Sequence, residues 1–319
     1  MCRRHCVDQF GRRPRGRHVR LGQPEFAAFL IVHEQAVLHD GARWSRWLHR
    51  YDDSKRRSID TLTRMQCMSR TFEDLVAEAD SVSVDGWDFS WLDGRATEER
   101  PSWGYQRLLS SRLATVSAAL DIHTGGGEVL SGAGPFPPTM AALETWPPNA
   151  ALATKRLHPL GVVLVATRDE PPLPFADGAF DLVTTRHPIS VWWTEVLRVL
   201  RPGGTYFAQH IGPATMGELV EYFIGPQPEK WAEFHPDAVG VQARAAGLQI
   251  VDLRMERLRA EFFDIGAVIY FLRKVVWTVP DFTVERYRDR LRELHEQIEA
   301  EGPFVAHPTR VLVEVRKPE

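Results

Sequence analysis

The sequence predicts an α/β protein in which a parallel sheet is covered by helices on both faces. From Ser117 onward, short apolar runs alternate with amphipathic segments, which is the pattern of alternating strands and helices. The first run, at 117–122, opens into three consecutive glycines at 125–127. A buried strand that ends in a glycine loop is typical of a ligand-binding turn, because glycine lets the backbone approach a ligand closely.

Seven strands and four helices are expected in this part of the chain. The strands lie near 117–122, 139–144, 161–166, 179–185, 204–210, 248–256 and 309–316, and the helices near 148–158, 190–200, 213–223 and 236–246. Asn149 can cap the helix that follows Pro147 and Pro148. The run Arg201-Pro202-Gly203-Gly204 should end a helix and turn into the next strand.

A long insertion at 262–307 separates the last two expected strands. It contains an apolar helical stretch at 265–272 and a charged helix near 283–300. Apolar residues of the charged helix are spaced by three or four positions, which favours core packing over a binding face. These residues are Tyr287, Leu291, Leu294 and Ile298.

The N-terminal part divides into an extension at 1–67 and a cap segment at 68–116, followed by the main domain at 117–319. The extension holds 14 Lys and Arg against 7 Asp and Glu, whereas the rest holds 25 against 35. We expect the extension to be poorly ordered or partly helical, with the native start at Met65 or Met68. The alternative is a basic arm that docks an anionic partner. The cap segment begins with a helical pattern at 69–79.

The composition is ordinary for a soluble globular protein, with 44% hydrophobic and 25% charged residues. Without a run of 18 apolar residues, no membrane partner is expected. The three cysteines fit a reducing cytosol, so a cytoplasmic location is expected. Cys2 and Cys6 lack a second pair of ligands, so no metal site is expected. An acidic body is unlike a nucleic-acid-binding surface, and the oligomeric state stays open.

Acidic residues end three successive strands of the predicted sheet, where ligands bind in such folds. Asp121 ends the strand at 117–122, and Glu144 ends the strand at 139–144. The Glu144 carboxylate can accept both hydroxyls of a ribose. Asp169, after the strand at 161–166, can accept the exocyclic amine of adenine. Apolar Leu173 can flank the adenine ring, so these strand ends predict a nucleoside site.

Taken in order, these features resemble the motifs of class I S-adenosylmethionine (SAM)-dependent methyltransferases, over about residues 85–319. The motifs are Asp121 with Gly125 and Gly127, then Glu144, Asp169, Leu173-Pro174-Phe175, Phe180-Asp181-Leu182-Val183 and Leu200-Arg201-Pro202-Gly203-Gly204. The later motifs are similar to those of the branch that acts on small molecules and diverse other acceptors. The resemblance implies a doubly wound, Rossmann-like sheet of order 3-2-1-4-5-7-6 with the last strand antiparallel. It also implies SAM as cofactor and methyl transfer to an unidentified acceptor.

The same resemblance implies roles for individual residues. Glu144 would hold the ribose, Asp169 would meet adenine N6, and Asp121 would contact the amino group of the methionine part. The loop around the methionine part would consist of His123, Thr124, Gly125, Gly126 and Gly127, and Leu173 and Arg186 would complete the cofactor site. An aromatic cap over cofactor and acceptor would contain Trp87, Trp91, Trp103 and Tyr105. The alternative for the cap is a helix that packs against the sheet.

His123 departs from the family pattern D-x-G-x-G-x-G, because it occupies the first glycine position. Histidine is among the residues that tolerate positive φ. Three interpretations stay open. The substitution is tolerated with SAM still bound, or the histidine touches the acceptor, or the site has decayed and no longer binds SAM.

Methyl transfer asks mainly for alignment and exclusion of water, and it needs a general base only for a hydroxyl or a protonated amine. His187 and His210, at the ends of the strands at 179–185 and 204–210, are the candidate bases. The alternative for His187 is a helix-entry residue before Pro188. The alternative for His210 is a residue of the pocket wall whose hydrogen bonds are satisfied within the protein. Arg186 can instead clamp a carboxylate or phosphate of the acceptor, or pair with a surface acid.

Three other classes of protein share some of these features. A dinucleotide-binding dehydrogenase requires G-x-G-x-x-G, and Leu130 stands where its third glycine would be. A catalytically degenerate SAM-binding or scaffold protein stays open. So does an RNA or protein methyltransferase that uses the basic arm, although the acidic body argues against a nucleic-acid partner.

Overall fold

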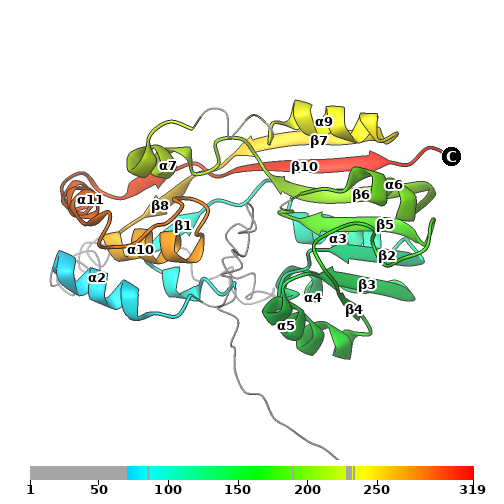
Figure 1. The fold of residues 1–319 in the computed structure, drawn as a ribbon, viewed down its shortest axis with the longest axis horizontal. Coiled ribbons are helices and arrows are strands. Elements are labelled where there is room, and N and C mark those ends of the chain that lie inside the picture. The colour runs from blue at the N-terminus through cyan, green and yellow to red at the C-terminus, as the bar shows by residue number, and fades with distance from the viewer. Residues whose placement is uncertain (1–69, 85–86, 189, 228–231, 233) are drawn as a thin grey trace, which may run out of the picture.

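The computed structural model of the protein describes residues 70–84, 87–188, 190–227, 232 and 234–319. These residues form two lobes, which lie side by side in Figure 1. The main lobe is built on a seven-stranded sheet and the small lobe on a sheet of three short strands. The predictions for residues 1–67, including the cysteine pair and the basic arm, lie outside the described residues.

The main sheet has the strand order β4-β3-β2-β5-β6-β10-β7. Its strands are β2 (Ala118–Ile122), β3 (Thr139–Glu144), β4 (Val163–Ala166), β5 (Phe180–Arg186), β6 (Leu200–Ile211), β7 (Gln249–Arg257) and β10 (Thr309–Arg316). β10 runs antiparallel to both β6 and β7, and the other neighbours are parallel. Numbered by their order in the main lobe, the strands follow 3-2-1-4-5-7-6, so the expected fold class and strand order are confirmed.

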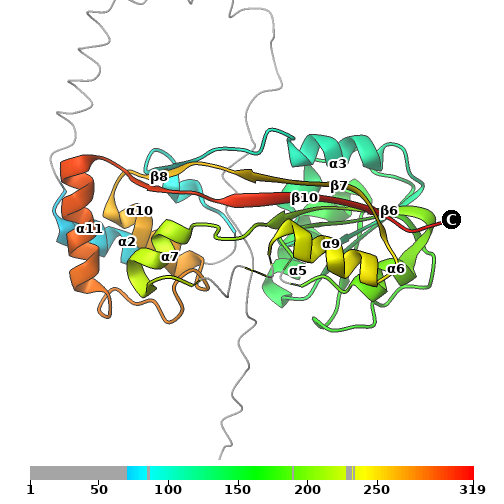
Figure 2. The ribbon, with the colours of Figure 1, turned by 90° about the horizontal axis from the view of Figure 1, so that it is seen from above.

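Helices cover both faces of this sheet because apolar side chains point alternately to its two sides. Ala119 packs with α3 (Tyr105–Leu113), α4 (Glu128–Ser131) and α5 (Pro147–Leu157), whereas Leu120 packs with α6 (Trp193–Val199) and α9 (Pro236–Ala245). Figure 2 shows α3 on one side of β10 and α9 and α6 on the other. The sheet is therefore doubly wound.

Two local expectations in the main lobe were wrong. The helix α5 begins at Pro147 with Trp146 as its N-cap residue, so Asn149 lies inside the helix and does not cap it. Proline suits the first helical position because its missing N–H would have no partner there. The run Arg201–Gly204 lies within β6, because β6 already begins at Leu200 and its pairing with β5 shifts register after Phe180.

The small lobe joins two distant parts of the sequence. Its sheet has the order β1-β8-β9, with β1 (Ala96–Glu98), β8 (Ala260–Phe262) and β9 (Phe304–Ala306). Around it pack α2 (Phe72–Ser81), α7 (Gly217–Ile224), α10 (Ile265–Lys274) and α11 (Arg288–Glu301), in one apolar cluster. The predicted stripe from Tyr287 to Ile298 is buried in this cluster, as expected. α3, by contrast, belongs to the main lobe, so the cap segment is shared between the lobes.

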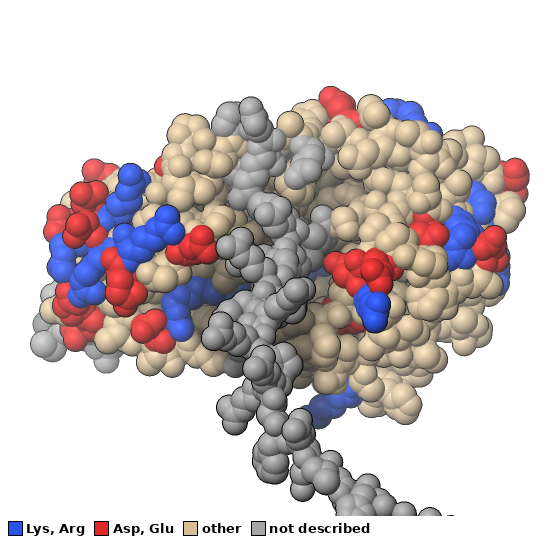
Figure 3. All heavy atoms as spheres, in the orientation of Figure 1, with Lys and Arg blue, Asp and Glu red and all other residues tan. Residues whose placement is uncertain are grey.

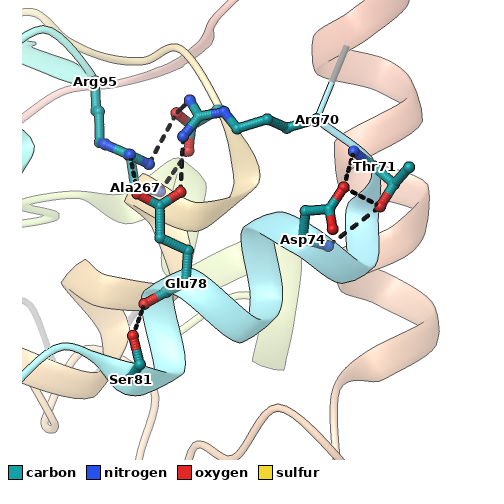
Figure 4. Close-up of polar contacts among 8 residues, drawn as sticks. Arg70, Thr71, Asp74, Glu78, Ser81, Arg95 and Ala267 are labelled. Atoms are coloured by element: carbon teal, nitrogen blue, oxygen red, sulfur yellow. Dashed lines mark hydrogen bonds and ion pairs between the residues drawn. The ribbon is translucent and has the colours of Figure 1, made fainter. Parts of the chain in front are cut away.

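A polar network fixes α2 against α10 (Figure 4). Thr71 and Asp74 cap α2 reciprocally, which satisfies two backbone donors at its first turn. Glu78 of α2 pairs with Arg70 at 2.7 Å and also with Arg95. Asp264, which accepts a hydrogen bond from the Ala267 amide, contacts both arginines and thereby joins the two helices.

Charged side chains of both signs gather over the end of the small lobe that carries α2 and α11 (Figure 3). Glu73 of α2 pairs with Arg292 of α11 at 2.8 Å and also with Arg288. Such exposed pairs add little to stability. Within the part of the chain that the structure describes, no helix is long and apolar enough to span a membrane.

Candidate active site

A cavity of about 610 Å³ lies between the two lobes, at the carboxyl ends of the main-sheet strands. The main lobe contributes the strand ends and loops that carry Asp121, Glu144, Asp169 and Arg186. The small lobe contributes Trp87, Arg273, Lys274 and Trp277. We call Asp121, Glu144 and Asp169 the carboxylate wall, and Arg186, Arg273 and Lys274 the basic wall. The fold thus brings together strand ends and an insertion that are far apart in the sequence.

The glycine loop passes between the cavity and α5. At Gly127, with φ of 79°, an added Cβ would lie 2.9 Å from Cγ of buried Leu157. At Gly125, with φ of 64°, an added Cβ would meet nothing closer than Cδ1 of Trp87, at 4.0 Å. Gly125 borders the cavity, so glycine serves helix packing at 127 and access to the cavity at 125.

Glu144 is buried and anchors this loop. Its Oε2 accepts a hydrogen bond from the Gly125 amide at 2.7 Å. Its Oε1 accepts from the amides of Thr145 and Trp146, at 2.8 and 2.9 Å. A carboxylate oxygen can accept about two hydrogen bonds, so Oε2 retains capacity for a ligand hydroxyl.

Asp121 is buried near the end of β2, beside Thr184 of the neighbouring strand β5. Burial raises the pKa of its carboxyl to about 6, although the Thr184 hydroxyl donates to Oδ1 at 2.6 Å and opposes the shift. Its negative charge is therefore costly in the protein alone and would be favoured by a cationic ligand group.

His123 and Asp169, expected to serve the cofactor separately, bond to each other. Nε2 of His123 lies 3.2 Å from Oδ1 of Asp169, and this contact lowers the pKa of the Asp169 carboxyl. His123 has φ of 56°, in the left-handed region that histidine tolerates. Its ring also meets Trp192 edge to face at 5.6 Å. Leu173 lines a smaller adjoining pocket with His123 and Trp192 rather than the main cavity.

The structure brings His187 to the cavity but not His210. His187 follows β5 and lines the cavity, whereas the His210 ring bonds to the Tyr206 hydroxyl at 2.8 Å and lies near Trp193 of α6. Burial lowers the pKa of His210 to about 3, so its ring stays neutral at ordinary pH. The alternation of side chains along β6 explains the separation, because His210 faces α6 and its neighbour Gln209 faces the other side.

A hydrogen-bond chain fixes the tautomer of His187. The Trp103 indole N–H, which can only donate, gives its hydrogen bond to Oε1 of Gln209 at 2.8 Å. The Gln209 amide nitrogen is thereby directed to Nε2 of His187, at 3.0 Å. Nε2 must accept this bond, so neutral His187 carries its proton on Nδ1. Trp103 thus acts on His187 through Gln209 and not as part of a cap.

The other expected cap residues also divide. Trp87 lines the cavity and lies 5.8 Å from Trp277, measured between ring centroids. Tyr105 lines it too, stacks on Phe207 at 5.3 Å and donates to the Thr185 carbonyl at 3.0 Å. Trp91 packs inside the small lobe against Tyr270, with centroids 4.8 Å apart. Trp87 and Tyr105 therefore line the cavity, whereas Trp91 packs within the small lobe and not against the main sheet.

Several cavity residues escaped the sequence analysis. Asn149 lines the cavity, and its buried Oδ1 has no hydrogen-bond partner among the described residues. Lys274, Arg273 and Trp277 belong to the insertion, more than a hundred residues from the glycine loop. No local pattern marks them.

These strand ends fall in a segment that matches a known family. Residues 120–208 match the family model described as Methyltransferase domain. The match runs from β2 into β6 and includes the glycine loop and the carboxylate wall. No curated protein matches the chain.

Several solved structures are similar to this chain at low sequence identity. A putative methyltransferase from Bacillus halodurans C-125 is 18% identical, with a TM-score of 0.49, over 67% of this chain and 99% of that chain. YcgJ from Bacillus subtilis is 16% identical, with a TM-score of 0.47, over 67% and 98%. Phosphoethanolamine N-methyltransferase 2 from Haemonchus contortus is 16% identical, with a TM-score of 0.44, over 78% and 61%.

Proposed function

We propose that this protein transfers a methyl group from SAM to a small-molecule acceptor in the cavity between the lobes. One observation carries the proposal. Three carboxylates end successive strands around a glycine loop, they line one cavity, and the segment that holds them matches the methyltransferase domain model. This arrangement places acceptors for the hydroxyls and amines of a nucleoside along one wall.

The residues present fit such a cofactor. Oε2 of Glu144 can accept a ribose hydroxyl while it holds the Gly125 amide. The buried Oδ1 of Asn149 needs a donor, which a nucleoside can supply. Asp121, whose pKa is raised by burial, gains from a cationic amino group close by. The open side of Gly125 leaves room for the methionine part.

SAM, when bound, supplies a methyl group on an electrophilic sulfonium, so the protein has to align the acceptor and exclude water. Trp87 and Trp277 present apolar rings at the small-lobe side of the cavity. Where the acceptor is a hydroxyl or a protonated amine, His187 is the proposed base. It would take the proton at Nε2, where the acceptor would replace the Gln209 amide.

Calorimetry with S-adenosylhomocysteine tests the cofactor site. We expect Glu144→Ala to weaken binding by about 30- to 100-fold, because charge-assisted bonds to the ribose and to the loop are lost. Glu299→Ala, an exposed site on α11, should bind like the wild type. In a transfer assay with labelled SAM and a small-molecule extract, His187→Ala should keep its affinity for S-adenosylhomocysteine and lose turnover. No binding by the wild type, or equal binding by the two glutamate variants, would refute the proposal.

The contact between His123 and Asp169 favours one second candidate, a scaffold protein whose degenerate site binds SAM weakly or not at all. The carboxylate assigned to adenine already has a partner at 3.2 Å. This candidate predicts weak or no binding of S-adenosylhomocysteine and no labelled methyl group in the small-molecule, RNA or protein fractions. Label in RNA or protein would instead support the alternative that uses the basic arm, which lies outside the described residues.

A further inference from the structure

Arg186 is a charged residue for which the described part of the chain provides no partner. It ends β5 and lines the cavity, yet its guanidinium makes no hydrogen bond or ion pair with any described residue. Other arginines nearby are paired. Arg310 pairs with Glu98, and Arg273 donates to the carbonyls of Ala79 and Val82.

The charge of Arg186 is also held at an electrostatic cost. Burial lowers its pKa to about 10, and the positive charges of Arg310 and Arg100 lower it further. Glu98 opposes this shift, but its carboxylate already pairs with Arg310. A partly buried cation whose nearest carboxylate already pairs with another arginine is unfavourable for folding alone, which points to a role with a ligand.

The rest of the basic wall strengthens the positive field on this side of the cavity. Lys274 and Arg273, at the end of α10, line the same cavity from the small lobe. Lys274 is buried, with Nζ 3.4 Å from the Val84 carbonyl and 5.1 Å from the ring centroid of Phe89. These positive charges favour a ligand whose negative group faces Arg186.

We propose that the methyl acceptor carries an oxyanion, a carboxylate or a phosphate, that binds Arg186 with its apolar body beside Trp87 and Trp277. The planar guanidinium presents a fork of donors that matches two oxygens of either group. The aromatic rings offer the flat apolar surface that a ring or short chain would cover. This inference rests on the proposed function, since it assigns the substrate class of the same cavity.

The test uses the full chain, with and without saturating S-adenosylhomocysteine, and a panel of matched fragments. Each aromatic or alkyl carboxylate is paired with its amide, and each phosphate monoester with its parent alcohol. Ligand-observed NMR finds the binders, and calorimetry measures their affinity. We expect the anions to bind at least about tenfold more tightly than their neutral partners. The class that binds more tightly, carboxylates or phosphates, identifies the oxyanion of the acceptor.

Variants at position 186 assign the effect to its guanidinium. Arg186→Gln should weaken anion binding by about 10- to 100-fold, and Arg186→Lys should weaken it less. Arg254→Gln removes an exposed, paired arginine of β7 and should leave binding unchanged. Arg186→Gln should keep a thermal midpoint at least as high as the wild type, because its guanidinium has no described partner to lose.

Three results would overturn the inference. Neutral fragments could bind as well as anions, no anion could bind, or anion binding could survive Arg186→Gln. A tenfold loss of S-adenosylhomocysteine affinity in Arg186→Gln would also overturn it, since the arginine would then serve the cofactor carboxylate. Failure of S-adenosylhomocysteine to bind the wild type refutes the proposed function instead. The binding measurements made without S-adenosylhomocysteine still decide whether the cavity prefers anions.

Discussion

The two walls of the cavity hold their charges in different ways. On the carboxylate wall the protein supplies the partners, with three backbone amides for Glu144, the Thr184 hydroxyl for Asp121 and the His123 ring for Asp169. On the basic wall, the Arg186 guanidinium has no hydrogen-bond or ion-pair partner in the described part of the chain. One wall is organised before a ligand arrives, whereas the other leaves a charge for the ligand to neutralise.

This difference separates two tasks. Carboxylates held by backbone amides keep their positions and can recognise hydroxyls and amines with little rearrangement. A buried cation held against other cations gains most from a ligand of opposite charge, so it favours anionic ligands over neutral ones. The cofactor and the acceptor can therefore be recognised by opposite fields within one cavity.

The largest effect is expected at the loop that the carboxylate wall anchors. Gly127→Ala places a Cβ 2.9 Å from Leu157 at φ of 79°, so strain and overpacking should cost about 3 kcal/mol of unfolding free energy. Gly125→Ala has open space and should cost only about 1–2 kcal/mol. Urea unfolding measures both. Equal losses in the two variants would show that contact with α5 does not hold the loop.

Asp121 sharpens the comparison between the two walls. Its carboxylate accepts a hydrogen bond from Thr184, yet its ionisation still costs free energy because the group is buried. Its pKa of about 6 lies above the ordinary value of 3.8, so the folded protein holds this proton more tightly than the unfolded chain does. This contribution is complete below pH 4 and is lost as the pH rises through 6, by about 3 kcal/mol in all. Asp121→Asn should remove that loss while it weakens S-adenosylhomocysteine binding.

Unfolding by urea at pH 4.5 and 7.5 measures this difference. The wild type should lose more stability between the two pH values than Asp121→Asn does. Asp237→Asn, at an exposed position of α9, should follow the wild type. If the unfolding free energies of Asp121→Asn and the wild type change equally between the two pH values, ionisation of the buried carboxylate does not destabilise the fold.

The sequence predicted the main lobe closely, because its signals are local. Apolar runs gave the seven strands, and their order followed from the resemblance carried by Asp121, Glu144 and Asp169. The three strands of the small lobe were not predicted, since each has three residues and pairs with a partner far along the chain. A strand that short leaves no alternating pattern to read.

The candidate site was predictable in outline and not in its contacts. The residues expected at the strand ends, the carboxylate wall and Arg186, line one cavity, and their contacts with a cofactor stay a prediction. The alternation of side chains along β6 places His210 on the face opposite Gln209, although both residues stand at the end of the same strand. Contacts such as that from Trp103 through Gln209 to His187 depend on tertiary packing over a hundred residues, which no local pattern encodes.

The smallest effect tests whether His123 belongs to the carboxylate wall or obstructs it. The contact with Asp169 is partly exposed, so it should add less than about 1 kcal/mol to stability. If its ring competes with adenine for that carboxylate, His123→Gly should tighten S-adenosylhomocysteine binding about threefold and raise the pKa of Asp169 toward 3.8. Asp169→Asn, in which the carboxylate is already lost, should remove most of this gain in the double variant. Unchanged or weaker binding in His123→Gly would mean that the histidine does not obstruct the site, and only weaker binding would make His123 a partner of the cofactor.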